Sequence, residues 1–526
     1  MTASAAPAAR SPQTKPSDEV APTSSSAKTW TPLAVVGFRA DEQLDARDVW
    51  MPTAVAETLA WRLRRVPGLT VIPTIRAHQS RQELAEKAGD PPAEWPRVVP
   101  LMGAKLWLRG VCAGTPYASV LDLELIQVGE ASASGAQIRL GPGRLFEVID
   151  EATRWTLGEL RISRIDQTTE ELIFAPPAKS PTALEYHAKA LAAARREDFR
   201  EGSFYAQEAV EADPSNCPAL MLLAKIELRS SPTAWRQAEM HLRQVKLISA
   251  SRKDTVTEAE FEVAQGLALM MQRSFEPARL RFETALTLAR AHHDPYGQLA
   301  AMNSLCDYWL SLPPTIESEQ PQEARASSNE QHLRHAVQWQ VRVLDLLRGL
   351  GDHVAEAPAA NKLALIYERL NEPELALEAH QQTIAAAKKI GSARTEATGC
   401  LFLGQWYRRQ ERWPEALEAT TRCLALAPDD AKPIIRISLA EIYRGMSMPR
   451  AALGQYESAY AALAHGADLP NQFRCLHAMA ELQMELGEPA TAIMRLSEAL
   501  DIAHVLGLAE EENIRKQLAQ WKGQTP

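Results

Sequence analysis

Three histidines are close enough in the sequence to be considered as metal ligands. His332 and His335 are three residues apart, which places both imidazoles on one face of a predicted helix, and His353 follows later. A zinc site needs three or four ligands in a fixed geometry, and the neighbouring sequence offers no matching ligand pattern. A solvated helix face is the favoured interpretation, so we expect no metal. The segment His-His-Asp at 292–294 is interpreted in the same way, as a polar turn.

The six cysteines and the motif content give little support to catalysis. No CxxC pair occurs, and although Cys400 and Cys423 could approach each other, small buried thiols in a reducing compartment are favoured. The sequence contains no P-loop, HExxH or GxSxG motif, and Gly-Pro-Gly-Arg at 141–144 is typical of a turn between a strand and a helix. We therefore predict no catalytic residues, no cofactor and no enzymatic activity.

The composition favours a soluble helical protein. A net charge of −9 argues against a general nucleic-acid-binding protein, which needs a basic surface. No run approaches the roughly 20 apolar residues of a membrane helix, and the N-terminus lacks a hydrophobic signal core. Hydrophobic residues make up 46% but aromatic residues only 6%, which suits helix packing better than β-sandwiches. We expect a cytoplasmic protein with several domains or a solenoid, and neither a nucleic-acid nor a membrane partner.

The N-terminal third predicts a tail followed by a small α/β domain. Residues 1–30 are rich in Ala, Pro, Ser and Thr and are predicted to be a disordered tail. Residues 31–165 then predict a βαβα-βββα domain, in which a proline-rich connection through residue 100 follows the second helix. The expected order is strand 33–38, helix 52–66, strand 69–75, helix 80–88, strands 104–112, 119–128 and 137–140, and helix 145–162.

Four segments of this domain carry a family resemblance. LAVVGF, RRVPGLTVIP, GAKLWLRGVC and LDLELIQVGEASASGAQIRL, in this order over about residues 31–162, resemble the TolB N-terminal-like domain of bacterial signalling proteins. In those proteins the domain lies just ahead of tetratricopeptide arrays. The resemblance implies a bacterial origin and a place in signalling.

A linker at 166–181 leads to an array of repeats at 182–508, with Ser180 and Pro181 placed as helix N-cap and first helical residue. The clearest repeat, at 399–428, consists of two amphipathic helices joined by a turn. Its Gly404 and Ala416 allow the helices to approach closely. With Leu403, Tyr407 and Pro428 at their offsets, the unit resembles a tetratricopeptide repeat.

The small residue early in the second helix recurs with steps of 36, 40, 58, 40, 40, 36 and 40 residues. The long step holds a polar insertion at 312–329, interpreted as an exposed, mobile loop. Because one unit cannot bury its apolar face alone, we expect about eight repeats and a capping helix within 509–526. The resemblance implies a right-handed α-α superhelix. The recurring residues are Gly202, Ala238, Ala278, Ala336, Ala376, Ala416, Ala452 and Ala492.

The resemblance also places a binding surface on the first helix of each repeat, which lines the concave groove. Side chains there are predicted to grip a peptide or helix through hydrogen bonds and ion pairs. An ordinary solvated helix face is the alternative. The set does not match the asparagine-and-lysine clamp of chaperone-binding members, so a C-terminal EEVD-type ligand is not favoured. The predicted groove residues are Asn361, Gln405, Arg408, Glu441, Arg444 and His477.

The leading functional hypothesis is a non-enzymatic scaffold or adaptor that binds a partner protein or peptide in this groove, and self-association stays open. The alternative is a ligand-sensing or regulatory component of a bacterial signalling system that acts through the α/β domain. An enzyme is the least supported class, because no titratable residues converge in the sequence.

Overall fold

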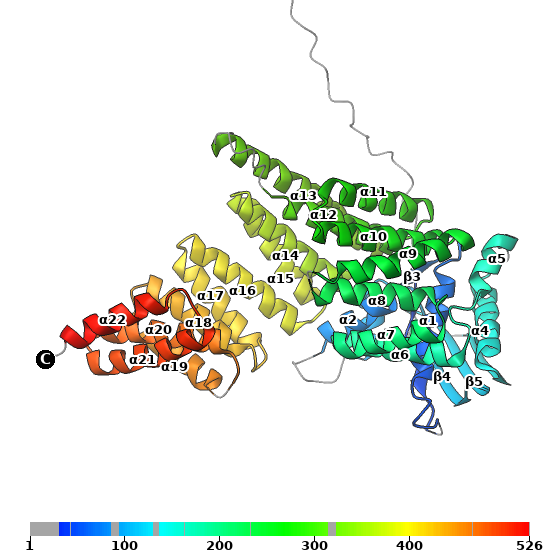
Figure 1. The fold of residues 1–526 in the computed structure, drawn as a ribbon, viewed down its shortest axis with the longest axis horizontal. Coiled ribbons are helices and arrows are strands. Elements are labelled where there is room, and N and C mark those ends of the chain that lie inside the picture. Colours follow the sequence, from blue (N-terminus) through cyan, green and yellow to red (C-terminus); the bar gives the residue numbers. More distant parts are fainter. Residues whose placement is uncertain are drawn as a thin grey trace, which may run out of the picture. The chain divides into compact units, whose positions relative to one another are not determined.

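A small α/β unit is followed along the chain by an array of paired helices in the computed structural model (Figure 1). The tail predicted for residues 1–30 lies outside the described residues, as do residues 314–321 of the predicted loop. Residues 322–329 of that loop instead belong to α13 (Gln322–Leu350), a helix of 29 residues. No described helix is both long and apolar enough to cross a membrane. The structure describes residues 31–42, 44–85, 94–129, 136–162, 164–231, 233–313, 322–464 and 466–524.

The α/β unit contains a mixed six-stranded sheet in the order β3-β1-β4-β5-β6, with β2 paired to β4. Strand β1 is parallel to β3 and β4, whereas β4, β5 and β6 pair antiparallel. The parallel pairs need crossover connections, which α1 and α2 help to provide. The bounds are β1 (Pro32–Val35), β2 (Arg39–Ala40), α1 (Met51–Leu63), β3 (Thr70–Ile72), α2 (Thr74–Glu83), α3 (Trp95–Leu101), β4 (Leu106–Thr115), β5 (Ala118–Gln127), β6 (Ala136–Gly143), α4 (Leu145–Glu159) and α5 (Gln167–Phe174).

Helices α2 and α3 differ from the sequence prediction. Helix α2 begins at Thr74 rather than near Ser80, because the extended backbone of Pro73 ends the strand segment and serves as the N-cap. The apolar run 69–75 therefore belongs partly to the helix. Helix α3 lies within the stretch predicted to be an irregular proline-rich connection, where Pro96 occupies the first turn, a position that tolerates proline.

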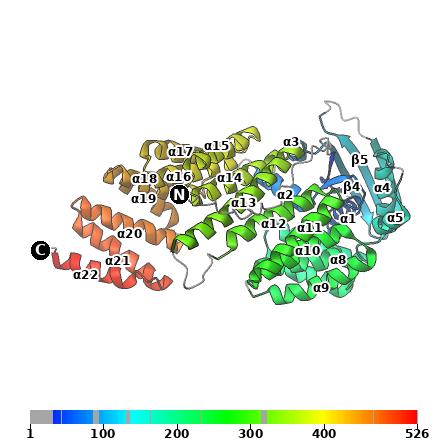
Figure 2. The ribbon, with the colours of Figure 1, turned by 90° about the horizontal axis from the view of Figure 1, so that it is seen from above.

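Eight helical hairpins and a final helix, α22, make up the array in the part of the chain that the structure describes. Figure 2 shows the hairpins following one another from α8–α11 through α14–α17 to α20–α22. Successive first helices pack directly on each other, as α10 does on α12 and α16 on α18. We call the side of the array formed by these first helices the inner face. The bounds are α6 (Pro181–Arg195), α7 (Phe199–Ala212), α8 (Cys217–Ser230), α9 (Trp235–Arg252), α10 (Thr255–Met271), α11 (Phe275–Ala291), α12 (Pro295–Ser311), α14 (His353–Arg369), α15 (Pro373–Lys389), α16 (Ala393–Arg409), α17 (Trp413–Leu426), α18 (Lys432–Gly445), α19 (Pro449–Leu463), α20 (Leu469–Glu485), α21 (Pro489–Leu506) and α22 (Glu511–Gln524).

The small residues that defined the predicted repeats lie at the helix–helix contacts. All eight are buried, and each lies on the second helix of its hairpin. Gly404 lies on α16, the first helix of its hairpin, and faces α17. A Cβ added to Gly404 would lie 2.3 Å from Thr420 Oγ1. A side chain at this position would therefore push α16 and α17 apart, as the sequence predicted.

The hydrophobic core of the α/β unit is continuous with the array. Leu59 of α1 and Ile149 of α4 are fully buried against the sheet, and the same cluster includes Ile173 of α5 and Leu184 of α6. The span 166–181, predicted to be a linker, thus contains a helix whose buried side chain joins this core. Residues 31–526 cluster as one unit.

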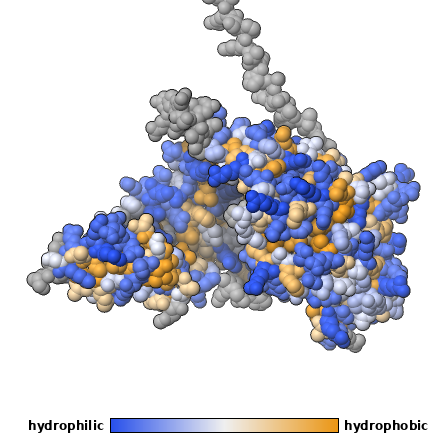
Figure 3. Space-filling model, in the orientation of Figure 1, coloured by the Kyte–Doolittle hydropathy of each residue, from blue (hydrophilic) through white to orange (hydrophobic). Residues whose placement is uncertain are grey.

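The visible surface in Figure 3 is mainly hydrophilic, with several apolar patches. The exposed apolar side chains include Met240 and Leu247 on α9 and Leu280 on α11. Apolar atoms make up much of any protein surface, so these side chains do not by themselves mark a site.

Candidate functional site

Four successive first helices of the array, α10, α12, α14 and α16, begin with the polar N-cap residues Asp254, Asp294, Asp352 and Ser392 in turn. In each case the side-chain oxygen accepts a hydrogen bond from a backbone N–H in the first turn. Such caps satisfy donors that have no partner within the helix. Each of these four residues also contacts the α/β unit, so one side chain both starts a helix and joins the two parts of the fold.

The most deeply buried of these contacts joins Arg65, just after α1, to Asp254. The two side chains are 1% and 3% exposed. Asp254 Oδ2 accepts hydrogen bonds from Arg65 Nη2 at 2.5 Å and from Nε at 3.1 Å. The guanidinium carbon also lies 3.4 Å from the ring centroid of Trp61. The hydrogen bonds to Asp254 fix the orientation of this buried guanidinium group.

The electrostatics of Asp254 keep this pair ionised at neutral pH. Burial alone would raise the pKa of Asp254, but the charge of Arg65 and the hydrogen bonds from Thr257 and Arg65 outweigh it and lower the pKa below its ordinary value of 3.8. The contact is therefore a charged hydrogen-bonded pair and not a neutral one.

Three further contacts repeat the arrangement along the array. Arg64 Nη2 lies 3.2 Å from Asp294 Oδ2. Arg76 of α2 donates to Asp352 Oδ2 from Nε at 2.8 Å and from Nη2 at 2.6 Å. Ser392 Oγ lies 3.1 Å from the carbonyl oxygen of Glu83, at the end of α2. We call the four together the docking contacts: Arg65–Asp254, Arg64–Asp294, Arg76–Asp352 and Ser392–Glu83.

A close backbone approach accompanies the docking contacts. Gly103, between α3 and β4, has φ +76°, and a Cβ added to it would lie only 2.0 Å from the carbonyl oxygen of Leu350. Leu350 ends α13 and belongs to the array. Glycine is thus required at residue 103 both by the backbone conformation and by the neighbouring chain.

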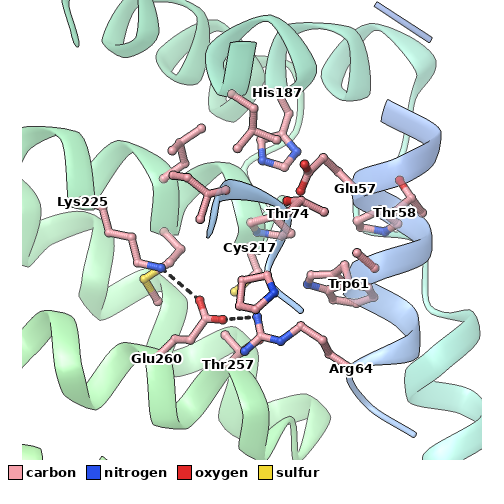
Figure 4. Close-up of a pocket in the computed structure, with 18 of the residues that line it drawn as sticks. Glu57, Thr58, Trp61, Arg64, Thr74, His187, Cys217, Lys225, Thr257 and Glu260 are labelled. Atoms are coloured by element: carbon pink, nitrogen blue, oxygen red, sulfur yellow. Dashed lines mark hydrogen bonds and ion pairs between the residues drawn. The ribbon is translucent and has the colours of Figure 1, made fainter. Parts of the chain in front are cut away.

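A cavity of about 310 Å³ remains between the α/β unit and the array. Its walls come from α1 and the β3–α2 junction on one side and from α6, α8, α10 and α12 on the other. Figure 4 shows Lys225, Glu260 and Arg64 joined by ion pairs along one wall. His187 projects from α6 near Glu57 of α1 in the same view.

The ionisation states within the cavity follow from burial and pairing. Burial lowers the pKa of His187 to about 4, with a further contribution from the charge of Arg195, so this imidazole is neutral at pH 7. Burial would raise the pKa of Glu260, but Lys225 and Arg64 hold it well below its ordinary value of 4.5. The wall therefore carries fixed, paired charges beside a neutral histidine.

The predicted groove residues lie farther along the inner face, and four of them take part in two neighbouring groups of ion pairs. Arg408 Nη1 lies 3.2 Å from Glu441 Oε2, which joins α16 to α18. Arg444 Nη2 lies 3.1 Å from an oxygen of Glu481 on α20, and His477 Nδ1 lies 3.8 Å from the other oxygen. We call the two groups, together with Arg474, the ion-pair ladder.

Two ladder residues were missed by the sequence prediction. Arg474 donates to Glu441 at 2.6 Å, and Glu481 accepts from Arg444. Glu481 lies eleven residues before its small residue (492 − 481), as Gln405 (416 − 405) and Glu441 (452 − 441) do, so the repeat register could have identified it. No such repeat offset identifies Arg474 from the sequence.

The remaining predicted groove residues, Asn361 on α14 and Gln405 on α16, are half-buried. Within the described ranges, neither is hydrogen-bonded to the ladder, and Asn361 Oδ1 is buried without a hydrogen-bond partner. The structure therefore brings together four of the six predicted residues.

The histidines considered as metal ligands make other contacts. His335 stacks on Trp309 with ring centroids 4.3 Å apart, and His332 lies 5.7 Å from the same ring. His353 Nδ1 lies 3.2 Å from Lys389 Nζ. Among the residues that the structure describes, no group of three or more His, Cys, Asp or Glu could hold a metal ion. All six cysteines are buried and unpaired.

Comparison with known proteins identifies the repeat. Residues 400–434 match the tetratricopeptide repeat family. They begin one residue after the start of the unit 399–428 that the sequence picked out. A comparison with curated proteins gives no significant match.

Three solved structures with similar folds have low sequence identity to this chain. A signal transduction ATPase with numerous domains and a tetratricopeptide repeat sensor, from Pyrococcus horikoshii, is 15% identical, with a TM-score of 0.48 over 70% of this chain and 57% of that one. The apo form of RapI is 11% identical, with a TM-score of 0.42 over 65% and 98%. The apo form of the quorum sensor NprR from B. thuringiensis is 12% identical, with a TM-score of 0.36 over 65% and 97%. This chain spans only 57% of the length of the Pyrococcus horikoshii protein, and likenesses at this level carry no functional argument.

Proposed function

We propose that this protein is a non-enzymatic scaffold that binds a partner protein or peptide through the ion-pair ladder on α16, α18 and α20. The observation that carries the proposal is that the ladder lies away from the docking contacts and keeps its arginines partly exposed. The docking contacts engage the N-caps of α10, α12, α14 and α16, whereas the ladder lies on first helices toward the C-terminal end of the array. Its arginines keep between 35% and 51% of their side-chain surface exposed.

The charges of the ladder favour an acidic partner segment. Arg408, Arg444 and Arg474 contribute three positive charges and Glu441 and Glu481 contribute two negative ones, so these five side chains carry a net charge of +1. Arginine forms directional, charge-assisted hydrogen bonds with carboxylates, and peptides are commonly recognised by a helix or strand laid along a groove. An acidic helix or extended segment could exchange pairs with the two glutamates.

The test reverses two ladder charges. The double variant Arg408→Glu with Arg444→Glu should bind a partner isolated on the wild-type protein at least tenfold more weakly, which corresponds to about 1.4 kcal/mol. A matched control is Arg200→Glu with Arg450→Glu, two exposed arginines on the second helices α7 and α19. Binding would be measured by calorimetry after affinity purification of the partner from the native cell.

Helicity and melting of both double variants should match the wild type, because partly exposed ion pairs contribute little to stability. Equal partner affinity for the ladder variant, the control and the wild type would exclude the ladder as the binding surface.

A regulatory role is the second candidate, and the docking contacts favour it. The α/β unit, with its resemblance to a signalling domain, is fastened to the inner face by buried ion pairs. If docking regulates the scaffold, the variant Gly103→Ala should change the partner's affinity for the ladder, because it disturbs docking without touching α16, α18 or α20. An unchanged affinity would count against regulation.

A further inference from the structure

We propose that the cavity between α1 and the inner-face helices α6, α8, α10 and α12 is a binding site for a small, uncharged aromatic molecule that carries a hydrogen-bonding group. This goes beyond the scaffold function, since the cavity and the ion-pair ladder share no residues. Cavities of a few hundred cubic ångströms between structural units are common ligand sites.

The charges around the cavity argue for an uncharged ligand. Three cations and two carboxylates line it, and every one of them has an opposite charge within ion-pair distance. A charged ligand would have to compete with an existing pair and leave a buried charge without a partner, which is strongly unfavourable. The pairs are Arg64 with Glu260 and Asp294, Arg65 with Asp254, Lys225 with Glu260, and Arg195 with Glu57.

Two hydroxyl groups in the cavity wall argue for a ligand that forms hydrogen bonds. Thr58 Oγ1 and the Tyr296 hydroxyl are buried without a hydrogen-bond partner among the residues described. Their residues are 2% and 6% exposed. Buried polar groups in folded proteins are almost always paired, so an unpaired hydroxyl on a cavity-lining residue marks a place where a bound molecule can supply the partner. The neutral imidazole of His187 offers one further donor and acceptor.

The apolar part of the wall argues for a planar ring. Trp61, Pro73 and Pro218 present flat or rigid surfaces to the cavity, and Met221 and Leu222 complete it. Aromatic rings stack favourably on such surfaces. The volume of about 310 Å³ lies at the low end for ligand pockets, which limits the ligand to one ring or two fused rings.

The position of the cavity gives binding a consequence. Its walls belong to the α/β unit and to the first four hairpins, so a bound molecule would contact both. Binding would therefore stabilise the docked arrangement by mass action.

The test uses the full-length chain and three uncharged probes, indole, 4-methylphenol and benzamide, with saturation-transfer NMR and calorimetry. At least one probe should bind the wild type. Thr58→Val and Tyr296→Phe keep the shape of the wall and remove its unpaired hydroxyls, so each should preserve the melting temperature, and the two combined should weaken binding at least fivefold.

A second pair of variants tests access to the cavity. Ala300 lines the cavity and is exposed, so Ala300→Trp should fold while blocking the mouth and should abolish binding. Ala425→Trp, at an exposed alanine of α17, is the control and should bind as the wild type does.

Failure of all three probes to bind, binding that survives Ala300→Trp, or an unchanged affinity in the Thr58→Val, Tyr296→Phe double variant would each overturn the proposal. The variant Arg408→Glu with Arg444→Glu should retain probe binding, which separates this result from the test of the scaffold.

Discussion

The corner residues of the hairpins show how much a single backbone angle matters in this array. Six hairpins turn through a residue with positive φ, five positions before the small residue of the second helix. Residues other than glycine are strained in this region, at a cost of roughly 1–2 kcal/mol. The residues are Glu197 (φ 61°), Arg273 (φ 58°), Asn371 (φ 57°), Glu411 (φ 57°), Ser447 (φ 57°) and Gly487 (φ 80°).

Exchanging glycine into and out of this corner should therefore shift stability in opposite directions. Glu411→Gly should stabilise the protein by about 0.5 kcal/mol, because the relief of strain exceeds the entropy that glycine adds to the unfolded chain. Gly487→Ala should destabilise it by a similar amount, since a Cβ at Gly487 meets open space and only the backbone is strained. Equilibrium urea unfolding would measure both. Changes of the same sign would refute the explanation.

At the scale of the elements, two helix N-caps allow the contribution of capping to be distinguished from the contribution of docking. Asp254 and Asp468 cap α10 and α20 in the same way, each accepting a backbone N–H three residues ahead. They also have the same position in the repeat, sixteen residues after the small residue (254 − 238 and 468 − 452). Only Asp254 has a buried arginine from the α/β unit against it.

Replacing each aspartate by asparagine isolates this difference. Asparagine keeps a capping oxygen, so Asp468→Asn should change the free energy of unfolding by no more than about 0.5 kcal/mol. Asp254→Asn leaves the buried Arg65 guanidinium without a counter-charge and should cost about 3 kcal/mol. Hydrogen exchange of α1 should rise only in the second variant. Equal losses would show that Asp254 acts only as a cap.

The same residues show what could be predicted from the sequence and what could not. The packing register could be read, because Ala416 is small for a local reason that recurs in every hairpin. Arg408, Glu441 and Arg444 follow from that register, and they do lie side by side. Asp294 could be assigned to a turn, but its partner Arg64 lies 230 residues away. Nothing local distinguishes a cap that docks from one that does not.

The whole molecule depends on close contact between the α/β unit and the array, and two glycines allow this to be tested. Gly103 and Gly68 both lie in the α/β unit with positive φ, 76° and 81°. Alanine at either residue strains the backbone by roughly 1–2 kcal/mol. Only at Gly103 would the new methyl group also collide with the array, at Leu350.

Gly103→Ala should therefore open the docked arrangement, whereas Gly68→Ala should lower the melting temperature slightly and leave docking intact. Small-angle X-ray scattering should show a larger radius of gyration for the first variant only. Hydrogen exchange should rise at α2 and at the start of α14, where Arg76 meets Asp352. Identical scattering curves for the two variants would contradict this role for Gly103.

The docking contacts also determine the order in which the hairpins unfold. In a simple solenoid each repeat touches only its neighbours, so unfolding can begin at either end and spread one unit at a time. Here the end of α1 and α2 reach four first helices, α10 to α16, and fasten hairpins that are far apart in the sequence to a single rigid body. Pulled from its C-terminus, the chain should release α22 and the hairpins α20/α21 and α18/α19 in small steps. The fastened hairpins should then yield together in one large step.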